Sequence, residues 1–424
     1  MRKKIQSVKG TREFYPPDMA LRNWLYEKIR YVSMLFGYQE YDGPFIEPLE
    51  LYAAKSGEEL VKEQSFVFPD RGGNLVALRP ELTPSLARLV AQKQHQLTYP
   101  LRWWSFGPFW RYEKPQKGRT REFFQWNIDL IGVNTPEADA ELVAICAVFF
   151  RLIGLTPDEV KIMVNDRRLM DMEITGLGIQ EEKKGLVFNL IDRRDKLAAG
   201  EWDAYILDEG FTARQLEGLK EIIDDNKLYQ KSRDMLRFFS AIEHLGVMEY
   251  VKYDARIVRG LDYYTGIVFE AKDTGETGRA ILGGGHYDNL VEDVGGDPLP
   301  GVGFAMGDVV LPIILEQQGK LPQLDLFPAK VMVTIFNEET KAYSHAISST
   351  LRQNGINTII YPDAVKLSRQ FKYSDRTGVR FVIVAGPEEL QADKLQVKNL
   401  TSGEQKSMDL QQAIEWISAE LDDA

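Results

Sequence analysis

The chain has 424 residues, more than a single hydrophobic core usually serves, so two or three domains are expected. Hydrophobic residues make up 44% and charged residues 27%, which excludes wholesale disorder. The net charge of -11 excludes a protein that coats nucleic acid nonspecifically, since such proteins neutralise many phosphates with Lys and Arg. It leaves room for a structured RNA bound through local basic patches.

Membrane and metal signals are both weak. No apolar run approaches the ~20 residues that span a bilayer, and the opening MRKKIQSVKGTREF lacks a signal-peptide core, so we expect a cytoplasmic protein with no membrane partner. The single cysteine, Cys146, lies in the apolar run LVAICAVFF and is expected to be a small buried hydrophobe. Four scattered histidines give no metal-ligand spacing, so any metal should arrive with a substrate.

The first elements follow from periodicity. Residues 18–37 have apolar side chains at helical spacing, which predicts an amphipathic helix. The segment 38–52, YQEYDGPFIEPLELY, is predicted to be extended and, because it contains Pro44 and Pro48, to lie at an edge or interface. Short strands are expected at 66–68 and 75–79, followed by a helix over 83–94.

A long hairpin follows these elements. LRWWSFGPFWRYE and REFFQWNIDLIG predict two aromatic-rich strands joined by the basic loop KPQKGRT. Residues 137–153 predict an apolar helix, and the helical, charge-rich pattern of 170–250 indicates an inserted subdomain.

Strand signals return in three segments, IVRGLDYYTGIVFEAK, RAILGGGHYDNLV and GVGFAMGDVVLPIIL. The segment 318–328 has the proline and glycine of a linker. Beyond it, VMVTIF, a helix to Arg352, NTIIYP, a helix around 368–374 and FVIVAG alternate, which predicts a small α/β domain.

Cations are concentrated in the hairpin, which carries Arg111, Lys114, Lys117, Arg119 and Arg121. Alternate strand positions point to one face, where guanidinium groups would clamp a polyphosphate. The alternative is a solvated basic hairpin.

Two further segments have an open interpretation. Arg259 follows apolar strand residues, and a charge in a strand built for burial needs either a structural carboxylate partner or an anionic ligand. The run Gly283–Gly285 would let the backbone approach a ligand closely, although a tight turn explains it equally well.

Taken together, these motifs resemble those of bacterial histidyl-tRNA synthetases over almost the whole chain. The phrases that carry the resemblance are VKGTREFYPPDM, FIEPLELY, LRPELTPSLAR, FWRYEKPQKGRTREFFQWNIDLIG, RGLDYYTG and SRQFKYSDRTGVRFVIVAG. A Rossmann-type nucleotide enzyme is disfavoured, because the first 320 residues lack a glycine-rich strand-to-helix fingerprint and parallel βαβ order.

The resemblance implies an α+β class II catalytic core, an antiparallel sheet with flanking helices, together with a helical insertion and a C-terminal α/β anticodon-binding domain. The expected boundaries are 1–169 and 251–318 for the core, 170–250 for the insertion, 319–328 for the linker and 329–424 for the anticodon-binding domain. Pro48 lies in the segment similar to the family's dimer-forming motif 1, so the resemblance implies a homodimer.

The implied activity joins L-histidine to ATP and then to tRNA(His). Arg111 resembles the arginine that binds the α-phosphate, Glu113 its neighbour at the adenosine, and Arg259 the arginine on the opposite side of that phosphate. Arg119 and Arg121 are further ATP-binding candidates, and Mg²⁺ should arrive bridging phosphate oxygens. Fixed cations on both sides would stabilise charge where it develops.

The remaining roles implied by the resemblance concern histidine and tRNA. Glu81 and Thr83 resemble the residues that hold the α-amino group, while Gln125 and Arg259 flank the carboxylate. Asp129 and Tyr264, with the adjacent Tyr263, resemble the imidazole readers. The expected tRNA contacts are Lys114, Gln116 and Lys117 at the acceptor end. Arg369, Lys372 and Arg376 are candidates for the anticodon side, with a solvated helix face as the alternative.

The sequence departs from the family pattern in two places. The family's third motif carries a glutamate and an arginine after GFAMG, where this chain has Val309 and Val310, and the glycine run ends in His286 instead of arginine. One interpretation is a synthetase in which Arg119, Arg121 or His286 neutralises the triphosphate. The alternatives are a histidine-binding regulatory paralog of ATP phosphoribosyltransferase and an RNA-binding adaptor, but the intact hairpin, RGLDYYTG and C-terminal domain favour the synthetase.

Overall fold

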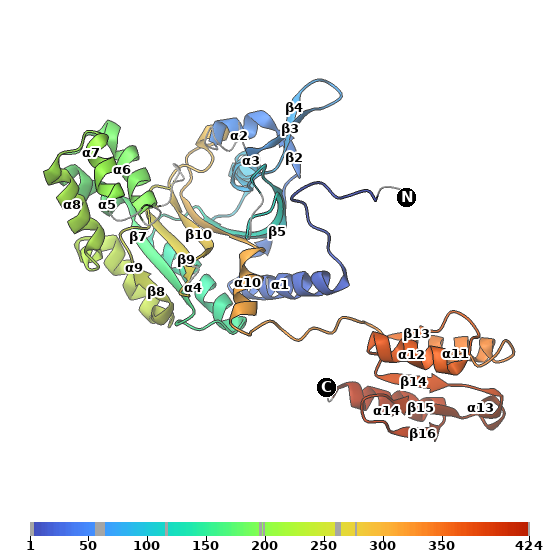
Figure 1. Ribbon diagram of the computed structural model, residues 1–424. Coiled ribbons are helices and arrows are strands. Elements are labelled where there is room, and N and C mark those ends of the chain that lie inside the picture. Colours follow the sequence, from blue (N-terminus) through green and yellow to red (C-terminus); the bar gives the residue numbers. More distant parts are fainter. Residues whose placement is uncertain are drawn as a thin grey trace. The chain divides into compact units, whose positions relative to one another are not determined.

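The computed structural model describes residues 4–55, 64–114, 118–194, 197, 200–258, 264–275 and 278–422. The chain forms two compact units, Met1–Pro322 and Gln323–Ala424. Figure 1 shows the elements of each unit in their order along the chain. No helix in these ranges combines the length and the apolar character needed to cross a bilayer.

The first unit is built on an eight-stranded sheet. In spatial order its strands are β1 (Gln39–Glu40), β5 (Leu101–Trp110), β6 (Glu122–Ile131), β11 (Gly301–Gly307), β10 (Ala280–Tyr287), β9 (Ile267–Asp273), β7 (Val160–Asp166) and β8 (Val251–Tyr253). From β5 to β7 every neighbouring pair is antiparallel, and only the two edge strands pair in parallel. The predicted aromatic hairpin is therefore confirmed as β5 and β6, at one side of an antiparallel sheet.

A three-stranded antiparallel sheet lies beside this core, in the order β2 (Ile46–Pro48), β4 (Leu75–Leu78) and β3 (Phe66–Pro69). Pro48 lies on the edge strand β2, a position that suits a residue without an N–H group. The strand does not continue as expected, because α2 (Leu49–Lys55) begins directly after Pro48. Its sequence LELYAAK consists mainly of good helix formers, which outweigh the weak alternation.

The first unit also contains the following helices. They are α1 (Pro16–Leu35), α3 (Thr83–Lys93), α4 (Pro136–Leu152), α5 (Arg167–Gly176), α6 (Glu181–Arg193), α7 (Glu201–Asp208), α8 (Ala213–Asp224), α9 (Arg233–His244) and α10 (Val310–Gln317). Short 3₁₀ turns lie at Gln94–Gln96, Leu228–Lys231, Met248–Tyr250 and Glu292–Val294. Helices α5 to α9, drawn in green, gather at one side of the unit (Figure 1).

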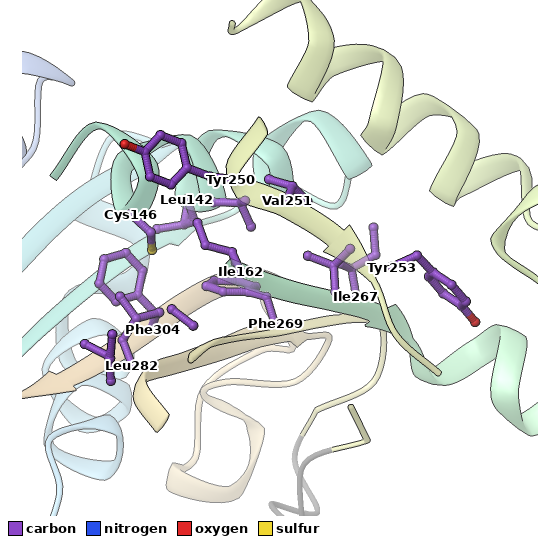
Figure 2. Close-up of a cluster of buried hydrophobic side chains, with 14 of the residues drawn as sticks. Leu142, Cys146, Ile162, Tyr250, Val251, Tyr253, Ile267, Phe269, Leu282 and Phe304 are labelled. Carbon is purple, nitrogen blue, oxygen red and sulfur yellow. The ribbon is translucent and has the colours of Figure 1, made fainter. Parts of the chain in front are cut away.

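Helix α4 forms the centre of the main core. Its side chains are buried almost all round, as expected of a helix enclosed by sheet and helices. Figure 2 shows Cys146 of this helix among Ile162, Phe269 and Phe304, which come from three different strands. Cys146 is fully buried, and burial raises the pKa of its thiol.

One expected strand is a helix. The run VVLPIIL was predicted to extend the strand GVGFAMG, but β11 ends at Gly307 and α10 begins at Val310. A short apolar run does not distinguish a buried strand from a buried helix. Pro312 lies in the first turn of α10, where proline is tolerated.

The second unit contains a five-stranded mixed sheet in the order β13 (Thr358–Ile360), β12 (Val331–Val333), β14 (Phe381–Val384), β15 (Leu395–Asn399) and β16 (Gln405–Met408). Strand β12 is parallel to both neighbours, whereas β15 and β16 are antiparallel additions. Its helices are α11 (Lys341–Gln353), α12 (Leu367–Thr377), α13 (Pro387–Ala392) and α14 (Leu410–Asp422). The predicted α/β alternation is confirmed through β14.

Candidate active site

Arg111 follows the last residue of β5 and is fixed by three contacts. Its Nε donates a hydrogen bond to the carbonyl of Pro80 (2.9 Å), and its backbone N–H donates to the carbonyl of Arg121 (2.9 Å). Its guanidinium lies 5.3 Å from the centre of the Phe123 ring. The hairpin thus holds a permanent cation in one orientation.

A cleft of about 230 Å³ opens beside Arg111. The hairpin side of the cleft consists of Arg111, Glu113, Gly118, Arg119, Thr120 and Phe123. The opposite side consists of Ala280, Ile281, Gly307, Val309 and Val310. The two valines that replace the charged residues of the family's third motif therefore line this cleft directly.

The other hairpin candidates differ in their surroundings. Arg119 lines the cleft, is largely exposed and lies 3.6 Å from the carboxylate of Glu113. Arg121 instead supports the hairpin, because its Nε donates to the carbonyl of Glu113 and its guanidinium lies 3.9 Å from the Tyr112 ring centre. Lys114 is exposed, whereas Gln116 and Lys117 fall outside the described residues.

A second polar site is buried further along β6. Phe123, Gln125 and Asp129 occupy alternate positions of this strand and so share one face of the sheet. Asp129 accepts a hydrogen bond from the hydroxyl of Tyr287 (3.0 Å). Burial raises the pKa of Asp129 to about 7, against the opposing effect of that hydrogen bond.

Tyr41 adds a second hydroxyl to the surroundings of Asp129. Burial, and then the charge of Asp129, raise the pKa of Tyr41 well above its ordinary value. Its hydroxyl is buried and has no hydrogen-bond partner within the described ranges. A buried polar group of this kind can be satisfied by a polar ligand.

Glycines make room for these side chains. A Cβ added to Gly303 would lie 2.1 Å from Oδ1 of Asp129, and one added to Gly285 would lie 2.8 Å from the ring of Tyr264. Gly284 has a structural role, because its Cβ would lie 2.3 Å from the carbonyl oxygen of Gly303. The glycine-rich strand β10 therefore admits Tyr264 on one face and packs tightly against β11.

The remaining expected histidine contacts lie close in the chain to elements of this site. Thr83 is the first residue of α3, and Glu81 lies two residues before it, in the segment that follows β4. Arg259 and Tyr263 fall outside the described residues. Of the strand expected over 257–272, the structure describes β9 from Ile267, whereas Ile257, Val258 and Tyr264 are not part of a strand.

His286 does not line the cleft beside Arg111. It is buried, and its Nδ1 lies 2.9 Å from Oδ1 of Asp139 on α4. It lines a separate pocket of about 60 Å³ with Asp166 and Arg168. Because neighbouring residues of a strand point to opposite faces, His286 faces α4 while Tyr287 faces Asp129. The hypothesis that His286 neutralises a triphosphate in the cleft is therefore wrong.

Two residues near Asp129 and one residue beside the cleft were missed by sequence reasoning. Tyr287 and Tyr41 belong to strands or loops far from Asp129 in the chain, so no local pattern joins them. Arg279 directly precedes the cleft residue Ala280, and a guanidinium just before a glycine-rich strand was the available signal.

The antiparallel sheet, with an arginine-bearing hairpin beside a cleft, has the architecture of a class II aminoacyl-tRNA synthetase core. A family model described as "Histidyl-tRNA synthetase" matches residues 10–308, and one described as "Anticodon binding domain" matches residues 330–420. The chain belongs to the histidyl-tRNA synthetase family.

Similar proteins agree over nearly the full length. The chain is 37% identical over 411 residues to a chloroplastic/mitochondrial histidine–tRNA ligase of Arabidopsis thaliana. The aligned region covers 95% of this chain and 84% of that protein. It is 32% identical to a histidine–tRNA ligase of Leptospira biflexa, with 98% of each chain covered. The crystal structure of histidyl-tRNA synthetase from Nostoc sp. PCC 7120 matches with a TM-score of 0.85 and 26% identity, over 99% of this chain and 100% of that one.

Proposed function

We propose that this chain is a histidine–tRNA ligase, which activates L-histidine with ATP and transfers the histidyl group to tRNA(His). The observation that carries the proposal is the position of the Arg111 cleft and the Asp129 site along one face of β6. A phosphate cleft and a buried polar pocket on one strand face bring two substrates together.

The first step joins the histidine carboxylate to the α-phosphorus of ATP and releases pyrophosphate. The nucleophile is already an anion at neutral pH, so no protein base is needed. In the proposal Arg111 and Arg259 lie on opposite sides of the α-phosphate and stabilise the charge that builds on its oxygens. Arg119 and Glu113 complete the ATP side, and Arg121 acts by holding the loop.

Selection of histidine rests on Asp129 with Tyr264 and Tyr263 at the imidazole. Glu81 and Thr83 hold the α-amino group, and Gln125 flanks the carboxylate. A wrong side chain would leave the buried hydroxyl of Tyr41 without a partner, and the carboxyl of Asp129 with only its hydrogen bond from Tyr287. That penalty gives a selectivity that an apolar pocket does not reach.

Magnesium belongs to the ATP side of this proposal. The described residues contain no cluster of three or more His, Cys, Asp or Glu side chains that could hold a metal ion. In this proposal Mg²⁺ would enter with ATP and supply neutralisation of phosphate charge, and Glu113 is the one carboxylate among the described lining residues.

The tRNA contacts extend over both units. Lys114, Gln116 and Lys117 meet the acceptor end, and the segment 329–424 binds the anticodon. The helical segment 170–250 is an insertion between the core segments 1–169 and 251–318, and 319–328 is the linker.

The apolar side chains exposed on the small sheet near Pro48 support homodimerisation there: Phe45, Ile46, Val67, Phe68 and Leu75. The proposed location is the cytoplasm.

Histidine-dependent exchange of labelled pyrophosphate into ATP tests the activation step. We expect robust exchange with histidine, and none with the other amino acids, in the unmodified chain. Arg259→Ala should abolish the exchange without changing the thermal midpoint. Charging of tRNA(His) in the same preparation tests the second step. Histidine binding by calorimetry without any exchange would contradict the proposed function and favour a regulatory histidine-binding protein.

A further inference from the structure

Arg279 lies at the place where the charged residues of the third motif are missing. A Cβ added to Gly118 would lie 2.7 Å from Nη1 of Arg279 and 3.8 Å from Cγ2 of Val310. The guanidinium of Arg279 and the side chain of Val310 therefore both lie close to Gly118 in the hairpin loop. Gly118, Val310 and Ala280, the residue after Arg279, all line the cleft.

The Nη1 atom of Arg279 is buried and has no hydrogen-bond partner among the described residues. A guanidinium presents its N–H donors in a rigid fork, and a buried donor left without an acceptor is costly. An anionic ligand in the cleft would supply the missing acceptor.

Other nearby arginines are already engaged. Nη2 of Arg12 contacts both carboxylate oxygens of Asp308, at 3.0 and 2.8 Å. Arg22 lies between the rings of Phe14 and Phe124, 4.6 and 4.4 Å from their centres. Arg12 also has a buried donor without a partner, its Nε, but its guanidinium charge is paired with Asp308. Arg279 differs from Arg12 in having no carboxylate partner among the described residues, and from Arg22 in having a buried donor without an acceptor.

We propose that Arg279 binds the terminal phosphates of ATP and takes the place of the cation that Val310 does not supply. The inference rests on the proposed function, because it assigns a residue to the ATP side of that site. Arg111 lines the cleft from the hairpin, and Arg279 directly precedes Ala280, which lines the opposite side. In this proposal a triphosphate in the cleft is held at its α-phosphate by Arg111 and at its far end by Arg279. The chain has moved a charge from the start of α10 to the start of β10.

Nucleotide binding by calorimetry on the full chain, with Mg²⁺ present, tests the assignment. Arg279→Ala should weaken ATP binding by about tenfold or more, the typical effect of losing a charge-assisted hydrogen bond. AMP binding should change less than twofold, because AMP lacks the terminal phosphates. Equal losses for ATP and AMP, or no loss for either, would overturn the proposal.

Steady-state pyrophosphate exchange gives a second readout. Arg279→Ala should raise KM for ATP by about tenfold and leave KM for histidine within twofold. Arg279→Lys retains the charge without the fork, so it should recover only part of the effect. Arg151→Ala is the matched control, because Arg151 pairs with Glu249 on the exposed surface and should leave both KM values unchanged.

Placing an arginine at position 310 of the Arg279→Ala variant gives the most specific test of the proposal. The double variant Arg279→Ala with Val310→Arg should bind ATP more tightly than Arg279→Ala alone, since the new side chain enters the same cleft. Failure of this rescue, with all variants melting at the same temperature as the unmodified chain, would count against a shared phosphate position. Exchange that is absent from the unmodified chain would instead contradict the proposed function, so the two failures are distinguishable.

Discussion

The imidazole end and the phosphate end of the candidate site are built in opposite ways. Around Asp129 the polar groups are buried, and a hydroxyl from β10 already pairs with the carboxyl. Around Arg111 the cleft lies beneath a hairpin loop, where Arg119 is largely exposed and Arg279 has a buried donor without a partner among the described residues. The difference teaches that the imidazole end is selective through buried polar groups, of which Asp129 is already paired and the Tyr41 hydroxyl is not, whereas the phosphate end relies on cations placed at and beside a cleft.

The largest effect is expected at the phosphate end. Arg111→Ala removes a fixed cation from the position where charge develops, so pyrophosphate exchange should fall by about a thousandfold or more in kcat/KM. Arg102→Ala is the control on the same strand, because Arg102 pairs with Glu141 outside the cleft. A loss below tenfold would mean that Arg111 only supports the hairpin.

The next effect concerns the stability of the imidazole end. The pKa of Asp129 is about 7 in the folded chain, against an ordinary value of 3.8. A raised pKa means that the unfolded chain loses this proton first, so the contribution of Asp129 to stability falls between pH 4 and pH 7. The difference corresponds to roughly 4 kcal/mol at most. Asp129→Asn should therefore raise the thermal midpoint by several degrees at pH 8 and give no gain near pH 4.

Tyr287→Phe sharpens this second test. The hydrogen bond from Tyr287 lowers the pKa of Asp129, so its removal should extend the loss of stability to higher pH. Tyr250→Phe is the matched control, because that hydroxyl donates to the carbonyl of Leu155 away from Asp129. A gain from Asp129→Asn that is equal at pH 4 and pH 8 would show that ionisation of Asp129 does not limit stability.

The smallest effect is expected for Gly118→Ala in the hairpin loop. Comparison with Gly154→Ala separates the cost of backbone strain from an effect on ATP binding. Gly118 and Gly154 have nearly equal positive φ angles, 84° and 83°, but only Gly118 has neighbours that an added Cβ would meet. Both alanine variants should lose about 1 kcal/mol of stability. Only Gly118→Ala should raise KM for ATP, by roughly fivefold, because its Cβ displaces Arg279 from the cleft. Equal KM values in the two variants would contradict that contact.

The sequence alone determined the element types wherever a periodic pattern was long. The helix near residues 18–37, the aromatic hairpin and the C-terminal alternation were confirmed, because amphipathic periodicity and β-branched or aromatic composition act locally. Short apolar runs were ambiguous. VVLPIIL is a helix because proline fits a first helical turn and the strand before it has already ended.

Family motifs in the sequence also indicated which strands carry the candidate site, including Arg111 on the hairpin and Asp129 further along it. Only the tertiary structure decided which side chains share a face. Strand alternation sends His286 to α4 and Tyr287 to Asp129, so neighbours in the chain serve different surroundings. Arg279 and Val310 both lie close to Gly118, and contacts between segments more than a hundred residues apart, such as Gly118 with Arg279, leave no local pattern in a sequence.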